Sequence, residues 1–145
     1  MEITDKVALI TGTRRIGSVV AVELARRGAD VVLGYNRSQE EAEAAATQIR
    51  TLGRKALSIQ ADVSKVVEVQ NLVGRVINEF GRLDVLVNMA SIYRSKPFSD
   101  TTEQDCDANM DVNLKSAFLC AQAVAPIMKA NGGGRIINFA DWIAA

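Results

Sequence analysis

The sequence predicts an α/β fold in which helices cover both faces of a parallel sheet, the doubly wound arrangement. Short runs rich in Val, Ile and Leu alternate along the chain with longer segments of helical period. Turn residues separate the two kinds of segment. Because crossovers between parallel strands are right-handed, these observations favour a five-stranded sheet in the order 3-2-1-4-5.

The individual elements follow this alternation. Strands are expected at 7–10, 31–35, 56–60, 83–88 and 136–140, and helices at about 16–28, 39–52, 65–80 and 110–129, with a short helical turn near 100–108. Gly28, Gly53 and Gly81 follow three of these helices, where a left-handed residue commonly ends a helix. Ser38 and Glu41 have the spacing of a capping box at the start of the second helix.

The expected helix at 110–129 is apolar on two faces. One stripe can cover the sheet and leave the other for a second helix, of the same chain or of another subunit. The alternative is a helix that is buried all round within this domain. The first stripe comprises Leu114, Ala117, Phe118, Ala121, Val124, Ala125 and Met128, and the second comprises Val112, Leu119, Cys120, Ala123 and Ile127.

The composition favours a single soluble domain over residues 1–145. The 17 basic and 17 acidic residues cancel, so bulk charge draws the chain neither to nucleic acid nor to an anionic membrane. Two cysteines and no histidine argue against a zinc site, and no metal is expected. The polar N-terminal residues do not resemble a signal peptide, and no apolar stretch approaches the roughly 18 residues of a membrane span. A cytoplasmic location is therefore expected.

Residues 11–18, called the glycine turn below, join the first strand to the first helix. At such a junction backbone N–H groups and the positive end of the helix dipole face a phosphate, and glycine lets the ligand approach the backbone. We therefore expect Gly12, Arg14, Arg15, Ile16 and Gly17 to contact the phosphates of a dinucleotide. A glycine turn without a ligand has the same pattern, so this segment alone leaves both interpretations open.

The second strand ends in Asn36, Arg37 and Ser38, where the ribose of a bound adenosine is expected. NAD-selective sites place a carboxylate there, and this segment has none. Arg37 offers a guanidinium to a 2′-phosphate, and the Ser38 hydroxyl and N–H add hydrogen bonds. The sequence therefore favours NADP(H), with these three residues as contacts. The alternative is a solvated arginine beside an ordinary helix cap.

Polar residues also follow the third and fourth strands, along the edge where open α/β sheets bind ligands. Asp62 and Val63 follow the third strand, and residues 88–91 read Asn-Met-Ala-Ser. Together, in this order and spacing, the four segments resemble the short-chain dehydrogenase/reductase family over essentially the whole chain. The resemblance implies a Rossmann-type dinucleotide-binding domain, in which Asp62 and Val63 hold the adenine.

The resemblance extends to a segment and a residue that the family uses near the reacting atoms. Residues 88–91 resemble the family's Asn-Asn-Ala-Gly segment, with Met89 and Ser91 as departures. The resemblance implies that Asn88, Ala90 and Ser91 contact the cofactor. Asn113 is similar to the family's catalytic asparagine, which supports a water-mediated proton relay.

Several departures resemble the pteridine-reductase-like branch of the family. Arg15 replaces the middle glycine of the turn, the cofactor strand ends in Arg37-Ser38, and Ser91 is followed by the aromatic Tyr93. In this branch Ser91 and Tyr93 are implied to bind substrate, with the ring of Tyr93 stacked on a flat molecule. A tyrosine of the core is the alternative for Tyr93.

Asp141 is the closest match to that branch, because most of the family has serine after the fifth strand. A carboxyl group there is implied to relay protons as a second catalytic group. A surface aspartate that caps a turn is the alternative.

Two features depart from the family pattern as a whole. Gly17 follows Gly12 by five positions, which makes the glycine turn one residue shorter. The family's Tyr-x-x-x-Lys pair, whose tyrosine protonates the carbonyl, does not occur in the sequence. We therefore expect an N-terminal portion of a longer enzyme, with the C-terminal part of the fold absent and an open apolar edge at the fifth strand.

The resemblance implies an NADPH-dependent oxidoreductase that reduces a carbonyl or a pteridine-like ring. A 3-oxoacyl carrier-protein thioester is the alternative substrate. A nucleotide-binding or oligomer-packing module without catalysis is the rival hypothesis. The expected partners are a small-molecule substrate and further copies of this chain, which meet through the 110–129 helix.

Overall fold

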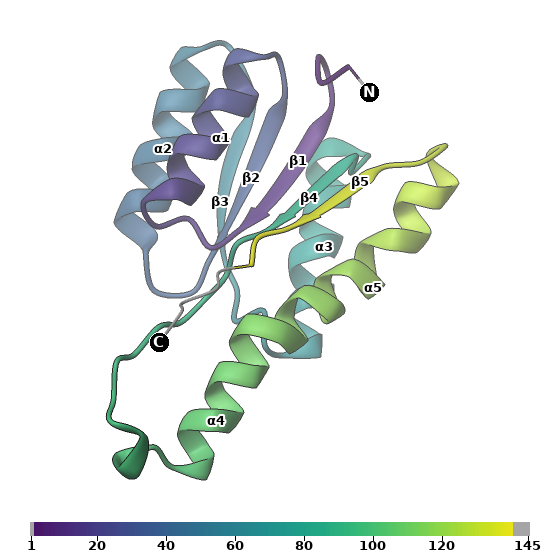
Figure 1. Cartoon of the computed structure of the whole chain (residues 1–145). Helices are drawn as coiled ribbons and strands as arrows, with labels where there is room; N and C mark the ends of the chain where they lie inside the picture. The colour runs from purple at the N-terminus through teal and green to yellow at the C-terminus, as the bar shows by residue number, and fades with distance from the viewer. Residues whose placement is uncertain (1, 141–145) are drawn as a thin grey trace.

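The computed structural model describes residues 2–140. Its sheet has five parallel strands in the order β3-β2-β1-β4-β5, as the sequence predicts (Figure 1). The strands are β1 (Val7–Thr11), β2 (Asp30–Tyr35), β3 (Ala56–Gln60), β4 (Val85–Asn88) and β5 (Arg135–Asn138). The α-helices are α1 (Ile16–Arg26), α2 (Gln39–Thr51), α3 (Val66–Phe80), α4 (Glu103–Met110) and α5 (Ser116–Ala130). None of these helices is long and apolar enough to cross a membrane.

The sheet separates two hydrophobic clusters. Helices α1 and α2 pack on one face, and α3 and α5 pack on the other (Figure 1). Ala8 and Ile10 of β1 belong to the first cluster, whereas Val7 and Leu9 belong to the second. Successive side chains of a strand point to opposite faces, so a central strand covered on both sides is apolar throughout. The first strand is accordingly buried along its whole length.

The strand register brings the carboxyl ends of the strands level with one another. Thr11 at the end of β1 pairs with Gly34 of β2 and with Asn88 of β4, and Asn88 pairs in turn with Asn138 of β5. The loops that follow these strands therefore leave the sheet at one edge, the edge that binds ligands in open α/β sheets.

Asp84 fixes the opposite edge of β1 and β4. Its buried carboxylate accepts hydrogen bonds from Val7 N at 2.9 Å and from Arg82 Nε and Nη2 at 2.8 and 2.7 Å, and Lys6 Nζ lies 3.9 Å away. Burial acts to raise the pKa of Asp84, but the hydrogen bonds from Arg82 and Val7 outweigh it and hold the pKa below its ordinary value.

Three glycines follow helix ends as predicted. Gly28, Gly53 and Gly81 have φ values of 90°, 78° and 73°, in the left-handed region that favours glycine.

The predicted capping box of Ser38 and Glu41 is wrong. Ser38 precedes α2 but makes no side-chain capping bond, because its hydroxyl lies 3.1 Å from the Thr13 hydroxyl instead. A capping box forms at the start of α4, where the Thr102 hydroxyl accepts from Asp105 N and the Asp105 carboxylate accepts from Thr102 N.

The helix expected at 110–129 is divided. Helix α4 ends at Met110, a π-helical turn spans Asp111–Lys115, and α5 follows. The short turn expected near 100–108 consists of a 3₁₀ turn at Phe98–Asp100 and then α4. A single π turn between helices frequently marks a functional position, and this one contains Asn113.

The predicted composition of the two apolar stripes is also wrong. A row of side chains four residues apart faces the sheet, and it includes Val124 and Met128, which the prediction placed away from Cys120. Leu114 and Phe118 are each 60% exposed, so the alternative of a helix buried all round is wrong as well. The buried row comprises Ser116, Cys120, Val124 and Met128, with Leu119, Ala123 and Ile127 packed beside it.

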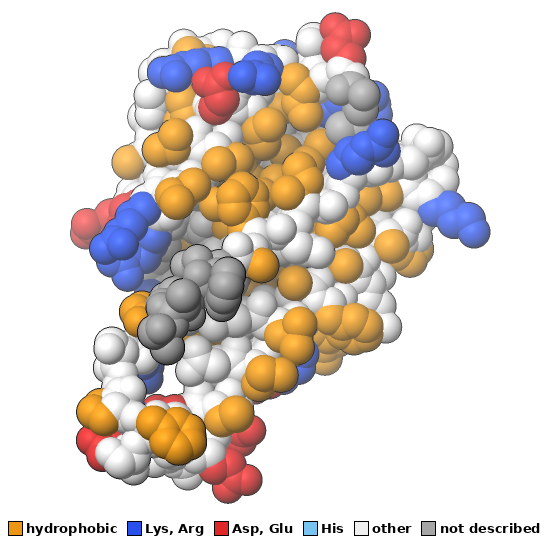
Figure 2. Space-filling view, viewed as in Figure 1, with side chains coloured by type: hydrophobic (Ala, Val, Ile, Leu, Met, Phe, Trp, Pro, Cys, Tyr) orange, Lys and Arg blue, Asp and Glu red, His pale blue; other side chains and the backbone are white. Residues whose placement is uncertain are grey.

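Within residues 2–140, β5 pairs with β4 alone and forms one edge of the sheet. All four of its residues are exposed, including Ile136 and Ile137. Figure 2 shows hydrophobic side chains gathered over the part of the sheet that α1 leaves uncovered. The open apolar edge that the sequence predicts is therefore present in the described chain.

Candidate functional site

The glycine turn is packed against the loop that follows β4. Met89 N donates to Thr11 O at 3.0 Å, and a Cβ added to Gly12 would lie 2.5 Å from Met89 O. Gly12 also has a φ of 82°. A Cβ added to Gly17 would lie only 2.0 Å from Gly12 O. Neither position has room for a side chain, so glycine is required at both.

Two arginines of the turn project from the start of α1. Arg14 and Arg15 are exposed, as is Ile16, and Arg14 Nε lies 3.9 Å from Glu41 Oε1. Arg15 has a φ of 50°, a conformation that costs a non-glycine residue energy and that clusters at functional sites. Arg15, the residue before α1, makes no side-chain capping bond within the described chain. Figure 2 shows Lys and Arg side chains gathered beside the starts of α1 and α2, where an anion would meet both helix dipoles.

The end of β2 divides its polar residues between solvent and interior. Asn36 and Arg37 are exposed, and Asn36 O accepts from Gln60 Nε2 at 3.1 Å. Ser38 is buried, and its Oγ lies 3.1 Å from Oγ1 of Thr13, which is fully buried. The glycine turn and the start of α2 are therefore joined through these two hydroxyl groups.

Asp62 after β3 is held in the carboxylate form. Its Oδ1 accepts from Ser64 N and Ser64 Oγ at 3.1 and 2.6 Å, and Lys65 Nζ lies 3.5 Å from Oδ2. Partial burial acts to raise the pKa of Asp62, but the Ser64 hydrogen bonds and the Lys65 charge outweigh it, so the pKa lies below its ordinary value. Val63 beside it is buried. The carboxylate is an acceptor, as binding of an amino group requires.

Asn88 links β4 to β5 at the same edge. Its Nδ2 donates to Asn138 Oδ1 at 2.9 Å, whereas its buried Oδ1 has no hydrogen-bond partner among the described residues. Ala90 is half-buried and Ser91 is exposed.

Asn113 connects the π turn to the loop after β4. Its Oδ1 accepts from Ile92 N at 2.8 Å and its Nδ2 donates to Ile92 O at 3.0 Å. This pairing fixes the loop directly beside Tyr93, which is 72% exposed. The alternative of a core tyrosine at position 93 is therefore wrong.

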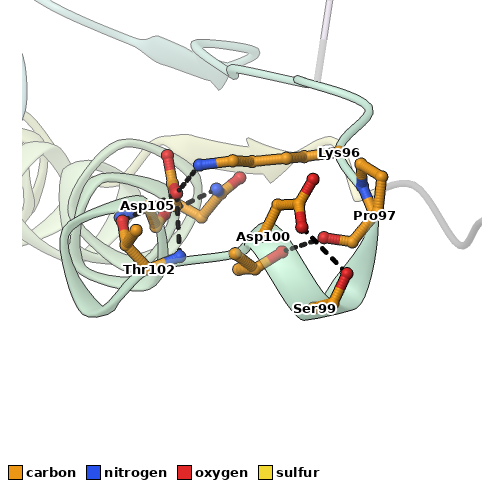
Figure 3. Close-up of polar contacts among 8 residues, drawn as sticks. Lys96, Pro97, Ser99, Asp100, Thr102 and Asp105 are labelled. Atoms are coloured by element: carbon orange, nitrogen blue, oxygen red, sulfur yellow. Dashed lines mark hydrogen bonds and ion pairs between the residues drawn. The ribbon is translucent and has the colours of Figure 1, made fainter.

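The far end of this loop is fixed to α4 (Figure 3). Lys96 Nζ lies 2.6 Å from Asp105 Oδ2, which also accepts from Thr102 N and Oγ1. The Lys96 hydrogen bond, with those from Thr102, holds the pKa of Asp105 well below its usual range. The segment that carries Ser91 and Tyr93 is thus attached to the π turn at one end and to α4, the helix before that turn, at the other.

Comparisons with known proteins assign the chain to a family. The family model described as short chain dehydrogenase matches residues 6–142. The chain belongs to the short-chain dehydrogenase family. It is 39% identical over 142 residues to the 3-oxoacyl-[acyl-carrier-protein] reductase FabG of Staphylococcus epidermidis, covering 97% of this chain and 58% of that protein. It is 38% identical over 136 residues to a hydroxynaphthalene reductase-like protein of Metarhizium robertsii, covering 93% of this chain and 50% of that one.

Solved structures of the short-chain dehydrogenase family share the fold. A short chain dehydrogenase from Burkholderia cenocepacia J2315 in complex with NADP matches with a TM-score of 0.87 and 41% identity, over 95% of this chain and 56% of its own. A short-chain type dehydrogenase/reductase from Mycobacterium marinum matches with a TM-score of 0.88 and 33% identity, over 94% and 56%. The chain therefore spans little more than half the length of these family members, as expected from the sequence.

One predicted site residue lies beyond the described residues, and two polar contacts at this edge of the sheet were not predicted. Asp141 is outside the described range. Thr13 and Asn138 were missed, because only the packing of the glycine turn on α2 and the β4–β5 register bring them to Ser38 and Asn88.

Two surface hollows of the described chain lie away from this edge of the sheet. One, of about 440 Å³, lies between α3 and α5 and includes Gly74 and Ile127. The other, of about 450 Å³, lies beside Arg50 and Phe80. No group of His, Cys, Asp and Glu within residues 2–140 has the arrangement of a metal site.

Proposed function

We propose that this chain binds NADP(H) and forms the cofactor half of an NADPH-dependent reductase. The observation that carries the proposal is the exposed Arg37 at the end of β2, beside Ser38 and without any carboxylate in the segment 36–38. A guanidinium there favours a 2′-phosphate, whereas NAD-selective sites need an acceptor for two ribose hydroxyls. The relative from Burkholderia cenocepacia, whose structure is an NADP complex, supports this choice.

The residues at this edge of the sheet fit the rest of the cofactor. Gly12 and Gly17, where a Cβ would collide with Met89 O and with Gly12 O, keep the turn narrow at the start of α1, and the dipole of that helix favours a pyrophosphate there. Arg14 and Arg15 add positive charge beside the expected phosphates. Ile16 and Asn36 are also exposed there and belong to the proposed contacts. When bound, the nicotinamide supplies the hydride.

Three further segments complete the proposed contacts. Asp62 accepts a hydrogen bond from the adenine amino group, and the Val63 backbone lies beside it. The segment that contains Asn88, Ala90 and Ser91 follows β4 at the carboxyl edge of the sheet, where we place the nicotinamide.

The substrate that we propose is a carbonyl compound. The relative named as a 3-oxoacyl-[acyl-carrier-protein] reductase favours this class, because a 3-oxoacyl group contains a ketone. Asn113 holds the loop that reaches the substrate and supports a proton relay, and Asp141 is proposed to relay a proton. The exposed Tyr93, two residues after Ser91, favours a second candidate, a flat pteridine-like ring that stacks on the phenol.

A nucleotide-binding module without catalysis is the rival proposal for the 145-residue chain. Neither Tyr35 nor Tyr93 is followed four positions later by lysine, so this sequence offers no pair of that kind to protonate a carbonyl. We expect the chain to bind NADPH while it turns over an acetoacetyl thioester or dihydrobiopterin slowly or not at all. Rapid turnover would refute the need for the pair.

The cofactor proposal is tested by separate titrations of NADPH and NADH. Wild type is expected to bind NADPH more tightly, and Arg37→Asp is expected to weaken NADPH binding by about 10- to 100-fold, because a charged hydrogen bond is lost. Arg75→Asp, at an exposed position of α3, is the matched control and should leave both affinities unchanged. Tighter NADH binding by wild type, or an Arg37→Asp variant with unchanged NADPH affinity, would refute the assignment.

We also propose that copies of this chain associate through α5 and the preceding π turn. Leu114 and Phe118 form an exposed apolar face there, and soluble proteins normally bury such faces. Size-exclusion chromatography with light scattering should give a mass above the 15.6 kDa of one chain, and Phe118→Arg should lower it. A wild-type monomer would exclude this role. The cytoplasmic location stays a prediction.

A further inference from the structure

Ser38 occupies the position before α2 without acting as its cap. Its backbone carbonyl accepts from Ala42 N at 3.1 Å, as the residue before a helix commonly does, but its hydroxyl makes no bond to the first N–H groups of α2. Serine is among the preferred capping residues, so a hydroxyl that turns away from the helix needs a competing partner. The partner in this chain is Thr13, 25 residues earlier in the sequence.

The contact between the two hydroxyl groups is buried. Thr13 has no exposed surface and Ser38 is 9% exposed, and their oxygens lie 3.1 Å apart. Each hydroxyl has one proton to donate and can accept in return. If Ser38 donates to a third group, it can still accept from Thr13, so Thr13 keeps the buried oxygen satisfied while the Ser38 proton points elsewhere.

We infer that Thr13 is a positioning residue for recognition of the 2′-phosphate. Its hydroxyl donates to Ser38 Oγ and holds the Ser38 proton toward the phosphate that Arg37 binds. Without that donor, Ser38 is free to rotate and cap α2, which removes one donor from the phosphate. This inference rests on the proposed NADP(H) function, and it adds to that function a residue outside the Arg37–Ser38 segment.

The test compares two small probes by calorimetry, adenosine 2′,5′-bisphosphate and 5′-AMP, which differ by the 2′-phosphate. Thr13→Val keeps the shape of the side chain and removes its hydroxyl. We expect this variant to bind the bisphosphate about 10-fold more weakly, the loss of one hydrogen bond to a charged group, and to bind 5′-AMP with unchanged affinity. Thr13→Ser restores the hydroxyl and should restore the wild-type ratio of the two affinities.

The outcomes separate the inference from the proposed function. Wild type that does not prefer the bisphosphate refutes the NADP(H) proposal and the role of Thr13 together. Wild type that prefers it, with a Thr13→Val variant of unchanged affinity ratio or of equally weakened affinity for both probes, refutes the role of Thr13 alone.

A double-mutant cycle with Ser38→Ala tests in a second way whether Thr13 acts through Ser38. If Thr13→Val does not fold, Thr13→Ala takes its place in both experiments. If Thr13 acts through Ser38, its substitution has no further effect on the affinity ratio in the Ser38→Ala background. Independent, additive effects of the two substitutions on that ratio would overturn the inference.

Discussion

Replacement of Gly17 by alanine tests the close packing of the glycine turn. The new Cβ would lie 2.0 Å from Gly12 O, whereas non-bonded heavy atoms settle at about 3.5 Å, so the turn must move by about 1.5 Å. Overpacking of this kind costs about 1–3 kcal/mol, and the upper end applies because the obstructing atom belongs to the backbone. Better helix propensity returns about 1 kcal/mol. We expect a net loss of about 2 kcal/mol in the free energy of unfolding.

Gly74→Ala is the matched control. Gly74 lies inside α3, and a Cβ added there meets no atom within 4 Å, so only the helix propensity changes and stability should rise by about 0.5–1 kcal/mol. Urea unfolding followed by far-UV circular dichroism measures both variants. The Gly17→Ala variant should also bind NADPH at least 10-fold more weakly, because its displaced N–H groups no longer meet the pyrophosphate. If Gly17→Ala is as stable as Gly74→Ala, the close packing described above is refuted.

Two other predictions concern titratable groups. Asp84→Asn should lower the free energy of unfolding by about 2 kcal/mol at neutral pH, since a buried charged acceptor is lost. Because the folded-state pKa of Asp84 is depressed, the gap between wild type and variant should stay constant above about pH 5 and shrink as the pH falls below about 4, in urea titrations. If the difference in free energy of unfolding between wild type and variant widens on acidification, the pKa of Asp84 is not depressed in the folded state. Burial raises the pKa of Cys120 to about 12, so at pH 8 only the exposed Cys106 should react quickly with a chromogenic disulfide reagent. A fast reaction that survives in Cys106→Ser would show that Cys120 is accessible.

The sequence predicts the fold well because the central strands are covered on two faces and are therefore largely apolar. The run Val7–Thr11 illustrates this, and the glycines after the helices add local signals that depend on φ alone. Features that depend on which surfaces meet are predicted less well. Ser38 has the sequence pattern of a cap, but a buried hydroxyl from a distant turn competes for it. Val124 and Met128 were assigned to the wrong stripe because the rotation of α5 on the sheet is set by packing.

The candidate site divides in the same way. Gly12, Gly17 and Arg37 follow from the chemistry that a strand-to-helix junction offers to phosphates. Thr13 and Asn138 have no such local pattern, since their partners are fixed by tertiary packing and strand register.

The most direct test of the central claim is an NMR footprint of NADPH on the 15N-labelled chain, which at 15.6 kDa is well suited to the method. The account predicts shifted backbone signals at the carboxyl edge of the sheet, in residues 12–18, 36–38, 62–63 and 88–91, and none at the amino-terminal edge around Asp84. Shifts that centre on the surface hollow between α3 and α5, or a spectrum that NADPH leaves unchanged, would contradict the proposed binding site.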